Sequence, residues 1–335
     1  MIQAGAEQVQ GVPMRHFQCV LLAGALTPSP LRQSLDIPVL CLPLSRQIRL
    51  LDLWLRVIDS QAGCSGVKIV VSSDMDAQRV QQVIDQRDES GLLQPTLAIE
   101  VLVDPHEYRG PAGRLRDIAD TVELAEDAAL IVGEASSHPP LSLHGVLAGL
   151  TEDVVGIVGT SAAREPAGLY AFTEPAIEVI PRIGFFDLKE QWLPALYERG
   201  LKVGMHVTVE QLLRIRDRSS YLAAVRRHIG AADDRSHTPS ETRSASAHVC
   251  PRSLIGDGVV IEDGAIIKDS VVMGGATIGS GAVVHRSIVG PSGVVPPRAR
   301  ACSTVVADAR PARSNRVALR ALRKIAAQPV KVARG

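Results

Sequence analysis

A six-residue repeat in Ser253–Val306 constrains the fold of this chain more tightly than any other feature. Each unit begins with an aliphatic residue and turns at Gly, Ser or Asp, and one shorter unit starts at Met273. A period of six is the signature of a parallel β-helix, in which each short strand stacks on its counterpart in the next coil. We therefore expect about three coils with an internal aliphatic column. The residues that lead the complete units are Ile255, Ile261, Ile267 and Ile278.

The bulk composition excludes several classes of protein. The chain has 335 residues, which suggests about two domains. Lys+Arg and Asp+Glu both number 36, so the basic excess that nucleic-acid binding needs is missing. No apolar run approaches the length of a membrane span, so we expect none. Five cysteines without a Cys-x-x-Cys pair indicate reduced thiols in a cytoplasmic protein.

The segment 17–228 alternates strands and helices. Aliphatic runs predict strands at 17–24, 67–71, 97–103, 128–133, 154–158, 168–172 and 202–209. Helices are predicted at 50–60, from a cap at Asp76 to 88, and at 113–124, 188–199 and 210–227. This alternation predicts a doubly wound α/β layer with a largely parallel sheet. Ligands bind at the carboxyl ends of such strands, which here are Ala23-Gly24, Val103-Asp104 and Gly133-Glu134.

Composition also predicts the boundaries between the parts of the chain. The expected parts are an N-terminal tail 1–16, the α/β domain 17–228, a polar linker 229–248, the β-helix 249–309 and a basic tail 310–335. No acidic residue follows Asp308. The tail is interpreted as a helix packed on the end of the β-helix with its charges in water, and the alternative is a docking or nucleic-acid-binding tail.

Four segments of the α/β part carry a family resemblance. They are Leu22-Ala23-Gly24 with 38–44, Gly110–Asp117, Gly168–Phe172 with 186–196, and Tyr221–Ala224. In this order they resemble motifs of the sugar-1-phosphate nucleotidyltransferases, also called nucleotide-sugar pyrophosphorylases. That family joins a Rossmann-like domain to a left-handed β-helix of hexapeptide repeats, so the resemblance implies the same architecture here.

The resemblance also implies a reaction and a set of binding residues. In the family, a sugar-1-phosphate oxygen attacks the α-phosphorus of a nucleoside triphosphate, and pyrophosphate leaves. Gly168 is the residue that the resemblance places at the sugar. The residues that it places at the nucleotide are Leu22, Ala23, Gly24, Gly110, Ala112 and Gly113.

Two kinds of charge are needed for that reaction. Mg²⁺ must be held by carboxylates, and Arg or Lys must face the phosphates. The resemblance places Glu134 at the metal, but the second metal carboxylate aligns with Arg214. The family's phosphate-binding Lys aligns with Val39, which leaves Arg32 as the candidate catalytic cation.

Further departures affect the glycine loop and the sugar wall. After Gly24 the loop loses its later glycines and gains Pro28 and Pro30, which cannot donate a backbone N–H. Between Gly133 and Gly168 the chain is too short for the family's usual sugar-pocket strands. Mg²⁺ is therefore expected only if the protein is active.

Three functions remain open from the sequence. The first is a non-catalytic relative that binds a nucleotide or nucleotide sugar and forms homo- or hetero-oligomers through its β-helix. The second is an active transferase with a remodelled site that uses Glu134 for Mg²⁺ and Arg32, Arg114 or Arg116 for phosphates. The third is a hexapeptide-repeat acyltransferase with His285 as its base.

Overall fold

The chain forms two compact units, Met1–Ala232 and Asp233–Gly335, which are described separately. The structure is a computed structural model. It describes residues 16–23, 29–88, 97–104, 109–121, 128–140, 142–151, 154–160, 166–207, 213–231 and 243–307. The predicted N-terminal tail, apart from His16, and the basic C-terminal tail lie outside these residues, as does most of the predicted linker.

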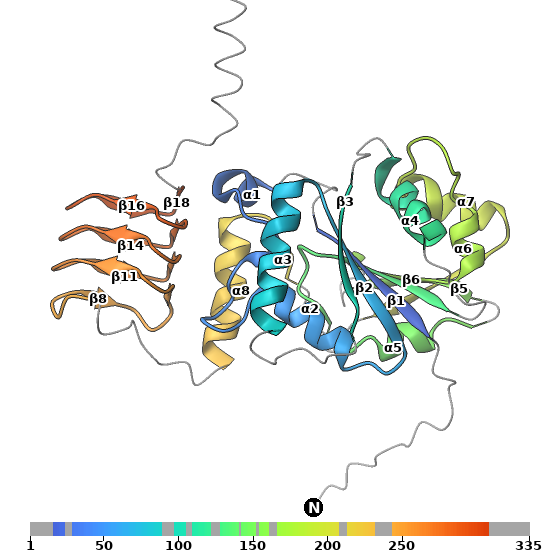
Figure 1. Cartoon of the computed structure of the whole chain (residues 1–335), viewed down its shortest axis with the longest axis horizontal. Coiled ribbons are helices and arrows are strands. Elements are labelled where there is room, and N and C mark those ends of the chain that lie inside the picture. Colours follow the sequence, from blue (N-terminus) through green and yellow to red (C-terminus); the bar gives the residue numbers. More distant parts are fainter. Residues whose placement is uncertain are drawn as a thin grey trace, which may run out of the picture. The chain divides into compact units, whose positions relative to one another are not determined.

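The first unit is built on a seven-stranded sheet with the order β3-β2-β1-β4-β6-β5-β7 (Figure 1). Strand β6 runs antiparallel to β4 and β5, and the other neighbours are parallel. The prediction of a largely parallel α/β sheet is confirmed. The strands are β1 (Phe17–Leu22), β2 (Cys64–Val71), β3 (Ile99–Val103), β4 (Ala129–Glu134), β5 (Val154–Thr160), β6 (Pro166–Phe172) and β7 (Lys202–Val207).

Helices cover both faces of this sheet. Val20 and Leu22 point into a core completed by α4, α6 and α7. Leu21 points to the opposite face, where Trp54 of α2 packs over Gly133. The helices are α1 (Pro30–Leu35), α2 (Leu50–Asp59), α3 (Asp74–Asp88), α4 (Gly110–Thr121), α5 (His144–Ala148), α6 (Glu174–Glu178), α7 (Leu193–Glu198) and α8 (Arg218–Ala231). A 3₁₀ turn, η1 (Val39–Cys41), and a π-helix, η3 (Leu188–Trp192), complete the unit. No helix in the described part of the chain is both long and apolar enough to span a membrane.

Several helix boundaries differ from the sequence predictions, and α4, for example, begins at Gly110 instead of at 113. Helix α3 is capped by Ser73, whose hydroxyl accepts from the Asp76 amide at 3.2 Å, so Asp76 is not the cap. Residues 210–212 of the helix predicted at 210–227 lie outside the described residues, and 213–217 are not helical. Helix α8 begins at Arg218, where Asp217 caps it by accepting from the Ser220 amide at 2.8 Å. The helix predicted at 188–199 starts as a π-helix, and Pro194 lies at the start of the α-helical part that follows.

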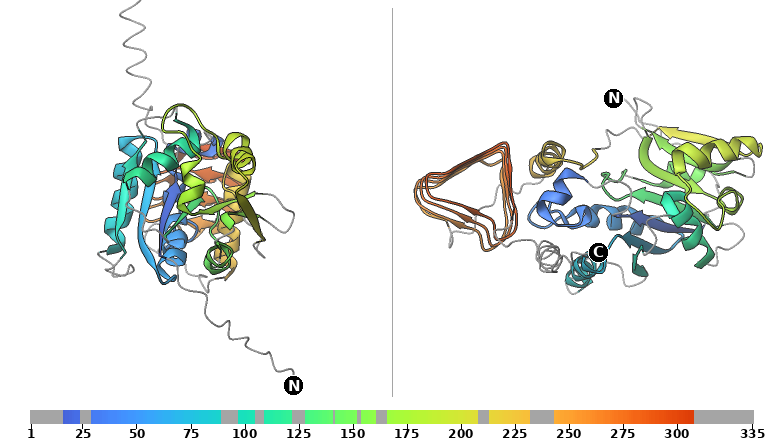
Figure 2. Two further views of the ribbon diagram at one scale, coloured as in Figure 1. Left: turned by 90° about the vertical axis from the view of Figure 1, so that its right-hand side faces the viewer. Right: turned by 90° about the horizontal axis from the view of Figure 1, so that it is seen from above.

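The second unit is a stack of coils whose strands form three parallel sheets. Figure 2 shows the stack end-on as a triangle. Two sheets contain four strands and the third contains three, so the stack is taller than the three coils predicted. The strands are β8 (His248–Val249), β9 (Leu254–Ile255), β10 (Val260–Ile261), β11 (Ile266–Lys268), β12 (Val271–Val272), β13 (Thr277–Ile278), β14 (Val283–His285), β15 (Ile288–Val289), β16 (Val294–Val295), β17 (Arg300–Cys302) and β18 (Val305–Val306).

The repeat sets the interior and the corners of this stack. The four isoleucines that lead the units are all buried in one core, as predicted. One coil takes 17 residues, as the hydrogen bond from the Ser287 amide to the Ser270 hydroxyl shows. Corner residues one coil apart, such as Gly264 and Gly281, share a left-handed backbone. Glycine adopts that conformation without steric cost, which explains the glycines that punctuate the repeat.

Candidate ligand-binding edge of the sheet

The carboxyl ends of β1 and β4 form the switch point of the sheet. From β1 the sheet continues through β2 and β3, and from β4 it continues through β6, β5 and β7. Ligands bind outside the strand ends at such a point. Leu22 pairs in register with Glu134, and the Ala135 amide donates to the Leu22 carbonyl at 3.0 Å. The predicted residues Leu22, Ala23 and Glu134 therefore lie together, whereas Gly24 lies outside the described residues.

Glu134 is held between a glycine and a guanidinium. A guanidinium nitrogen of Arg214 lies 3.4 Å from a carboxylate oxygen of Glu134. The two side chains are 20% and 15% exposed. Gly168 has a φ of +73°, and a Cβ there would lie 3.0 Å from the Glu134 Cβ and 2.9 Å from the Ser137 hydroxyl. The predicted sugar-binding glycine is thus a place where the backbone packs directly on Glu134.

Arg214 reaches Glu134 because its backbone runs beside residues 136–138. The Ile215 amide donates to the Ser136 carbonyl at 2.7 Å, and the His138 amide donates to the Leu213 carbonyl at 2.9 Å. These bonds flank an isolated antiparallel bridge between Ser137 and Arg214. The sequence predicts a helix at position 214, and this pairing explains why the backbone there is extended instead.

Tyr170 contributes a hydroxyl to the same neighbourhood. Burial, followed by the negative charge of Glu134, raises the pKa of Tyr170, while Arg214 opposes the shift. The phenol therefore remains protonated at neutral pH and keeps its capacity to donate a hydrogen bond.

The residues around Glu134 do not fit Mg²⁺. Magnesium prefers several oxygen ligands in near-octahedral geometry, whereas Glu134 faces a guanidinium. Within the described ranges, no three His, Cys, Asp or Glu side chains are placed to share a metal ion. The expectation that Glu134 binds Mg²⁺ stays a prediction without support from this geometry.

The candidate catalytic cation, Arg32, is bound to other side chains of the chain. Its guanidinium donates to the Ser72 hydroxyl at 2.9 Å and forms an ion pair with Asp76. Asp36, the acidic residue four positions after Arg32, pairs with Arg79 at 3.1 Å. The role of Arg32 in catalysis stays a prediction.

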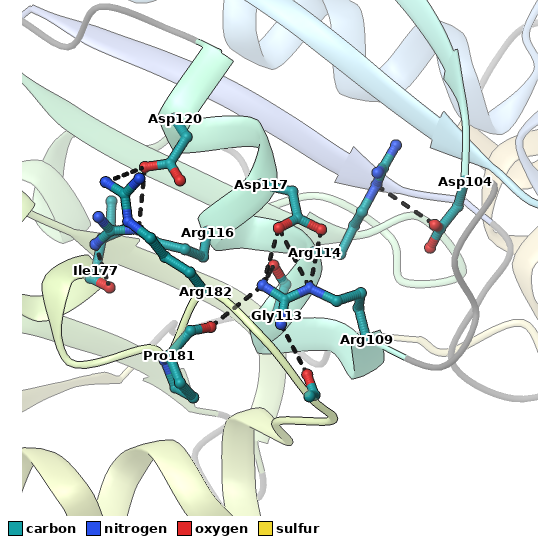
Figure 3. A network of polar contacts seen from close by, with 11 residues as sticks. Asp104, Arg109, Gly113, Arg114, Arg116, Asp117, Asp120, Ile177, Pro181 and Arg182 are labelled. Atoms are coloured by element: carbon teal, nitrogen blue, oxygen red, sulfur yellow. Dashed lines mark hydrogen bonds and ion pairs between the residues drawn. The ribbon is translucent and has the colours of Figure 1, made fainter.

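The other candidate phosphate ligands are also in ion pairs, around helix α4 (Figure 3). The Nε atom of Arg114 lies 3.6 Å from Oδ1 of Asp104, whose carboxylate is almost fully buried. The Nε atom of Arg116 lies 3.1 Å from Oδ1 of Asp120. Each guanidinium therefore has a carboxylate of the same chain beside it.

The start of α4 is also engaged internally. The predicted nucleotide-binding amides of Ala112 and Gly113 donate to the Phe186 carbonyl, at 3.0 and 3.3 Å. A Cβ on Gly110, whose φ is +68°, would lie 2.9 Å from the Phe185 ring. These predicted residues thus contact the segment before η3, and a nucleotide would have to displace the Phe186 carbonyl to use their amides.

Two histidines form a contact that sequence reasoning missed. His138 Nδ1 lies 2.9 Å from the Pro139 carbonyl, and His138 Nε2 lies 2.9 Å from His228 Nε2. The carbonyl requires a proton on Nδ1 of His138, so the neutral ring accepts from His228 through Nε2. The pKa of His228 is lowered to about 4, mainly by burial and then by interaction with His138, Arg227 and Arg56. His228 lies ninety positions from His138, and no local motif joins them.

This pair predicts a pH dependence of stability. The folded pKa of His228, about 4, lies below its ordinary value of 6.5, so the unfolded chain binds more protons in that window. Stability should fall by about 1–2 kcal/mol as the pH drops through it, a value discounted because solvent partly screens the ring. The free energy of unfolding, measured with urea at several pH values in this window, should change more steeply with pH for wild type than for His228→Gln. An equal pH dependence in the two proteins would contradict the prediction.

The first unit is an α/β layer on a largely parallel sheet with a switch point, and the second is a stack of parallel hexapeptide coils, so the chain is an α/β protein with a parallel β-helix. Residues 237–321 match the family model described as the GMPPB C-terminal domain. That match covers the β-helix part of the chain and points to a family of the nucleotide-sugar pyrophosphorylase type. The match supports the resemblance for the β-helix part of the chain. No curated protein matches the chain.

Proposed function

We propose that this protein is a non-catalytic relative of the sugar-1-phosphate nucleotidyltransferases that binds a nucleotide or nucleotide sugar. It would act as a regulatory or scaffolding partner in nucleotide-sugar synthesis. Assembly with copies of itself or with a related chain through the β-helix belongs to the same proposal. The β-helix match and the switch-point edge of the sheet support the ligand class.

The ion pairing of the candidate site residues is the observation that carries the non-catalytic part. Arg32 pairs with Asp76, Arg114 with Asp104, and Glu134 with Arg214. Nucleotidyl transfer brings a triphosphate and a sugar phosphate together, and like charges in a partly buried site repel by several kcal/mol. Fixed cations must offset that repulsion. Here each candidate cation already offsets a carboxylate of the chain, so little positive charge is left for two anionic substrates.

A combined assay tests the proposal. The protein is incubated with Mg²⁺, each common nucleoside triphosphate and a panel of sugar-1-phosphates, and pyrophosphate release is measured. We expect no turnover, together with a rise of several degrees in unfolding temperature for at least one nucleotide or nucleotide sugar. Glu134→Gln should increase that rise because it removes a negative charge beside Arg214. Glu174→Gln, an exposed change on α6, is the matched control and should leave it unchanged.

Two outcomes would contradict the proposal in different ways. Turnover that vanishes in Glu134→Ala would establish the active transferase with a remodelled site. Absence of any thermal shift with every nucleotide and nucleotide sugar would contradict the binding role. Acyl transfer from an acyl-CoA that depends on His285 would establish the third function instead.

A further inference from the structure

The carboxylate that ends β4 already has a permanent cation beside it. The Arg214 guanidinium lies 3.4 Å from Glu134, and both side chains are mostly buried. A guanidinium stays protonated at every physiological pH, so its charge does not depend on conditions. The negative charge of Glu134 is therefore compensated by the chain itself.

Both partners of this ion pair are fixed in place. Glu134 is the last residue of a central strand and pairs in register with Leu22. Its side chain is confined by Gly168, which leaves no room for a Cβ. Arg214 is held by the backbone bonds of its two neighbours to residues 136 and 138. The guanidinium is thus positioned before any ligand binds, because its side chain loses its conformational entropy when the unit folds.

We propose that Arg214 acts as a built-in cation that takes the place of a divalent metal beside Glu134. Two consequences follow from its charge. An anionic ligand binds at this edge without a metal ion, and the residue at position 214 by itself keeps divalent cations away from Glu134. The first consequence rests on the proposed function, since it concerns the nucleotide or nucleotide sugar. The second concerns only the metal and can be tested alone.

Charge reversal at position 214 is the direct test of metal exclusion. In Arg214→Asp two carboxylates share the place of the ion pair, and paired carboxylates are the oxygen ligands that hard divalent cations prefer. With Mn²⁺ as the probe and no nucleotide present, binding is measured by electron paramagnetic resonance and by the unfolding temperature. We expect Arg214→Asp to bind one Mn²⁺ at least about tenfold more tightly than wild type. The double variant Glu134→Gln/Arg214→Asp should lose this binding.

A neighbouring arginine provides the matched control. Arg216 is two residues away and its side chain is exposed, so Arg216→Asp makes the same change in net charge away from Glu134. Arg216→Asp should bind Mn²⁺ no better than wild type. Tryptophan fluorescence shows whether each variant is folded.

Three results would overturn the inference. One is a wild-type protein that binds Mn²⁺ and loses it in Glu134→Gln. Another is a folded Arg214→Asp variant that binds no more Mn²⁺ than Arg216→Asp. If Arg214→Asp does not fold, Arg214→Gln replaces it: we expect Mn²⁺ to raise the unfolding temperature of Arg214→Gln and not that of wild type. No rise for Arg214→Gln would be the third contrary result.

Thermal shifts produced by nucleotides distinguish this inference from the proposed function. The thermal shift that a nucleotide produces in wild type should be the same in Mg²⁺ and in EDTA, and in Arg214→Asp it should require Mg²⁺. A wild-type shift that needs Mg²⁺ would overturn the inference and leave nucleotide binding intact. If no nucleotide shifts any form, the proposed function fails while the Mn²⁺ result still decides metal exclusion.

Discussion

Asp52→Ala is expected to destabilise the α/β unit by about 3–5 kcal/mol. Asp52 of α2 forms an ion pair with Arg87 of α3, and their side chains are only 2% and 8% exposed. A second oxygen of Asp52 accepts from the Arg49 amide at 2.7 Å and closes the capping box at the start of α2. Removing the carboxylate takes the Asp52 charge away from the buried Arg87 and also removes the cap.

The same pair predicts an asymmetry between single and double replacements. Burying two charges carries a desolvation penalty that their attraction only partly offsets, so replacing both with apolar side chains is often neutral. The double variant Asp52→Leu/Arg87→Met should therefore be more stable than Asp52→Ala. Denaturant unfolding measures both. Exposed Glu100, which pairs with Lys68 across β2 and β3, is the control, since Glu100→Ala should cost at most about 1 kcal/mol. If Asp52→Ala lowered the free energy of unfolding by no more than Glu100→Ala does, the expected effect of the buried pair would be contradicted.

The β-helix was predictable because its information is local and periodic. A six-residue spacing of Ile255, Ile261 and Ile267 fixes which side chains point inward, and all three are buried. The parallel strands β1, β2 and β4 were predictable for a similar reason, since strands buried on both faces read as continuous aliphatic runs. The stack has more strands than three coils need, because β8 at His248–Val249 precedes the first unit that the repeat reveals, at Ser253.

The charge partners at the candidate site were not predictable. Arg32 and Asp76 are 44 residues apart, and no spacing rule links them. Asp36 is the acidic residue close to Arg32 in sequence, but its carboxylate pairs with Arg79. The sequence shows only that Arg214 stands where the family has a metal-binding carboxylate. It does not reveal the contact with Glu134, because that contact depends on the bridge between residues 214 and 137. Tertiary pairing of this kind leaves no periodic trace in the sequence.

These ion pairs also explain how buried charges are accommodated at this edge of the sheet. Buried carboxylates such as Asp104 need a compensating charge, and Arg114 supplies it within the chain. Glu134 and Arg214 make the same compensation at the switch point. Internal neutralisation maintains the fold of the edge and at the same time lowers its net attraction for polyanions, which links stability to the proposed loss of catalysis.

Trp54→Ala is expected to cost about 3–5 kcal/mol, because it empties a large volume beneath the candidate site. Trp54 is 1% exposed, and its indole N–H donates to the Ser137 carbonyl at 2.9 Å. The ring also fills the space that Gly133 leaves open. Trp54→Phe should cost less, about 1–3 kcal/mol, mainly because the Ser137 carbonyl loses its donor. Trp192 remains in both variants as the fluorescent probe of unfolding.

A double-mutant cycle with Gly133 tests whether the ring and the glycine fit each other. A Cβ on Gly133 would lie 2.6 Å from the Trp54 ring, so Gly133→Ala forces a shift in a packed interior and should be destabilising. The shorter ring in Trp54→Phe relieves that overlap. Gly133→Ala should therefore cost less in the Trp54→Phe background than in wild type, with a coupling of about 1 kcal/mol or more. Strict additivity would show that the glycine at the end of β4 is there for another reason, because no packing conflict would then join these two positions.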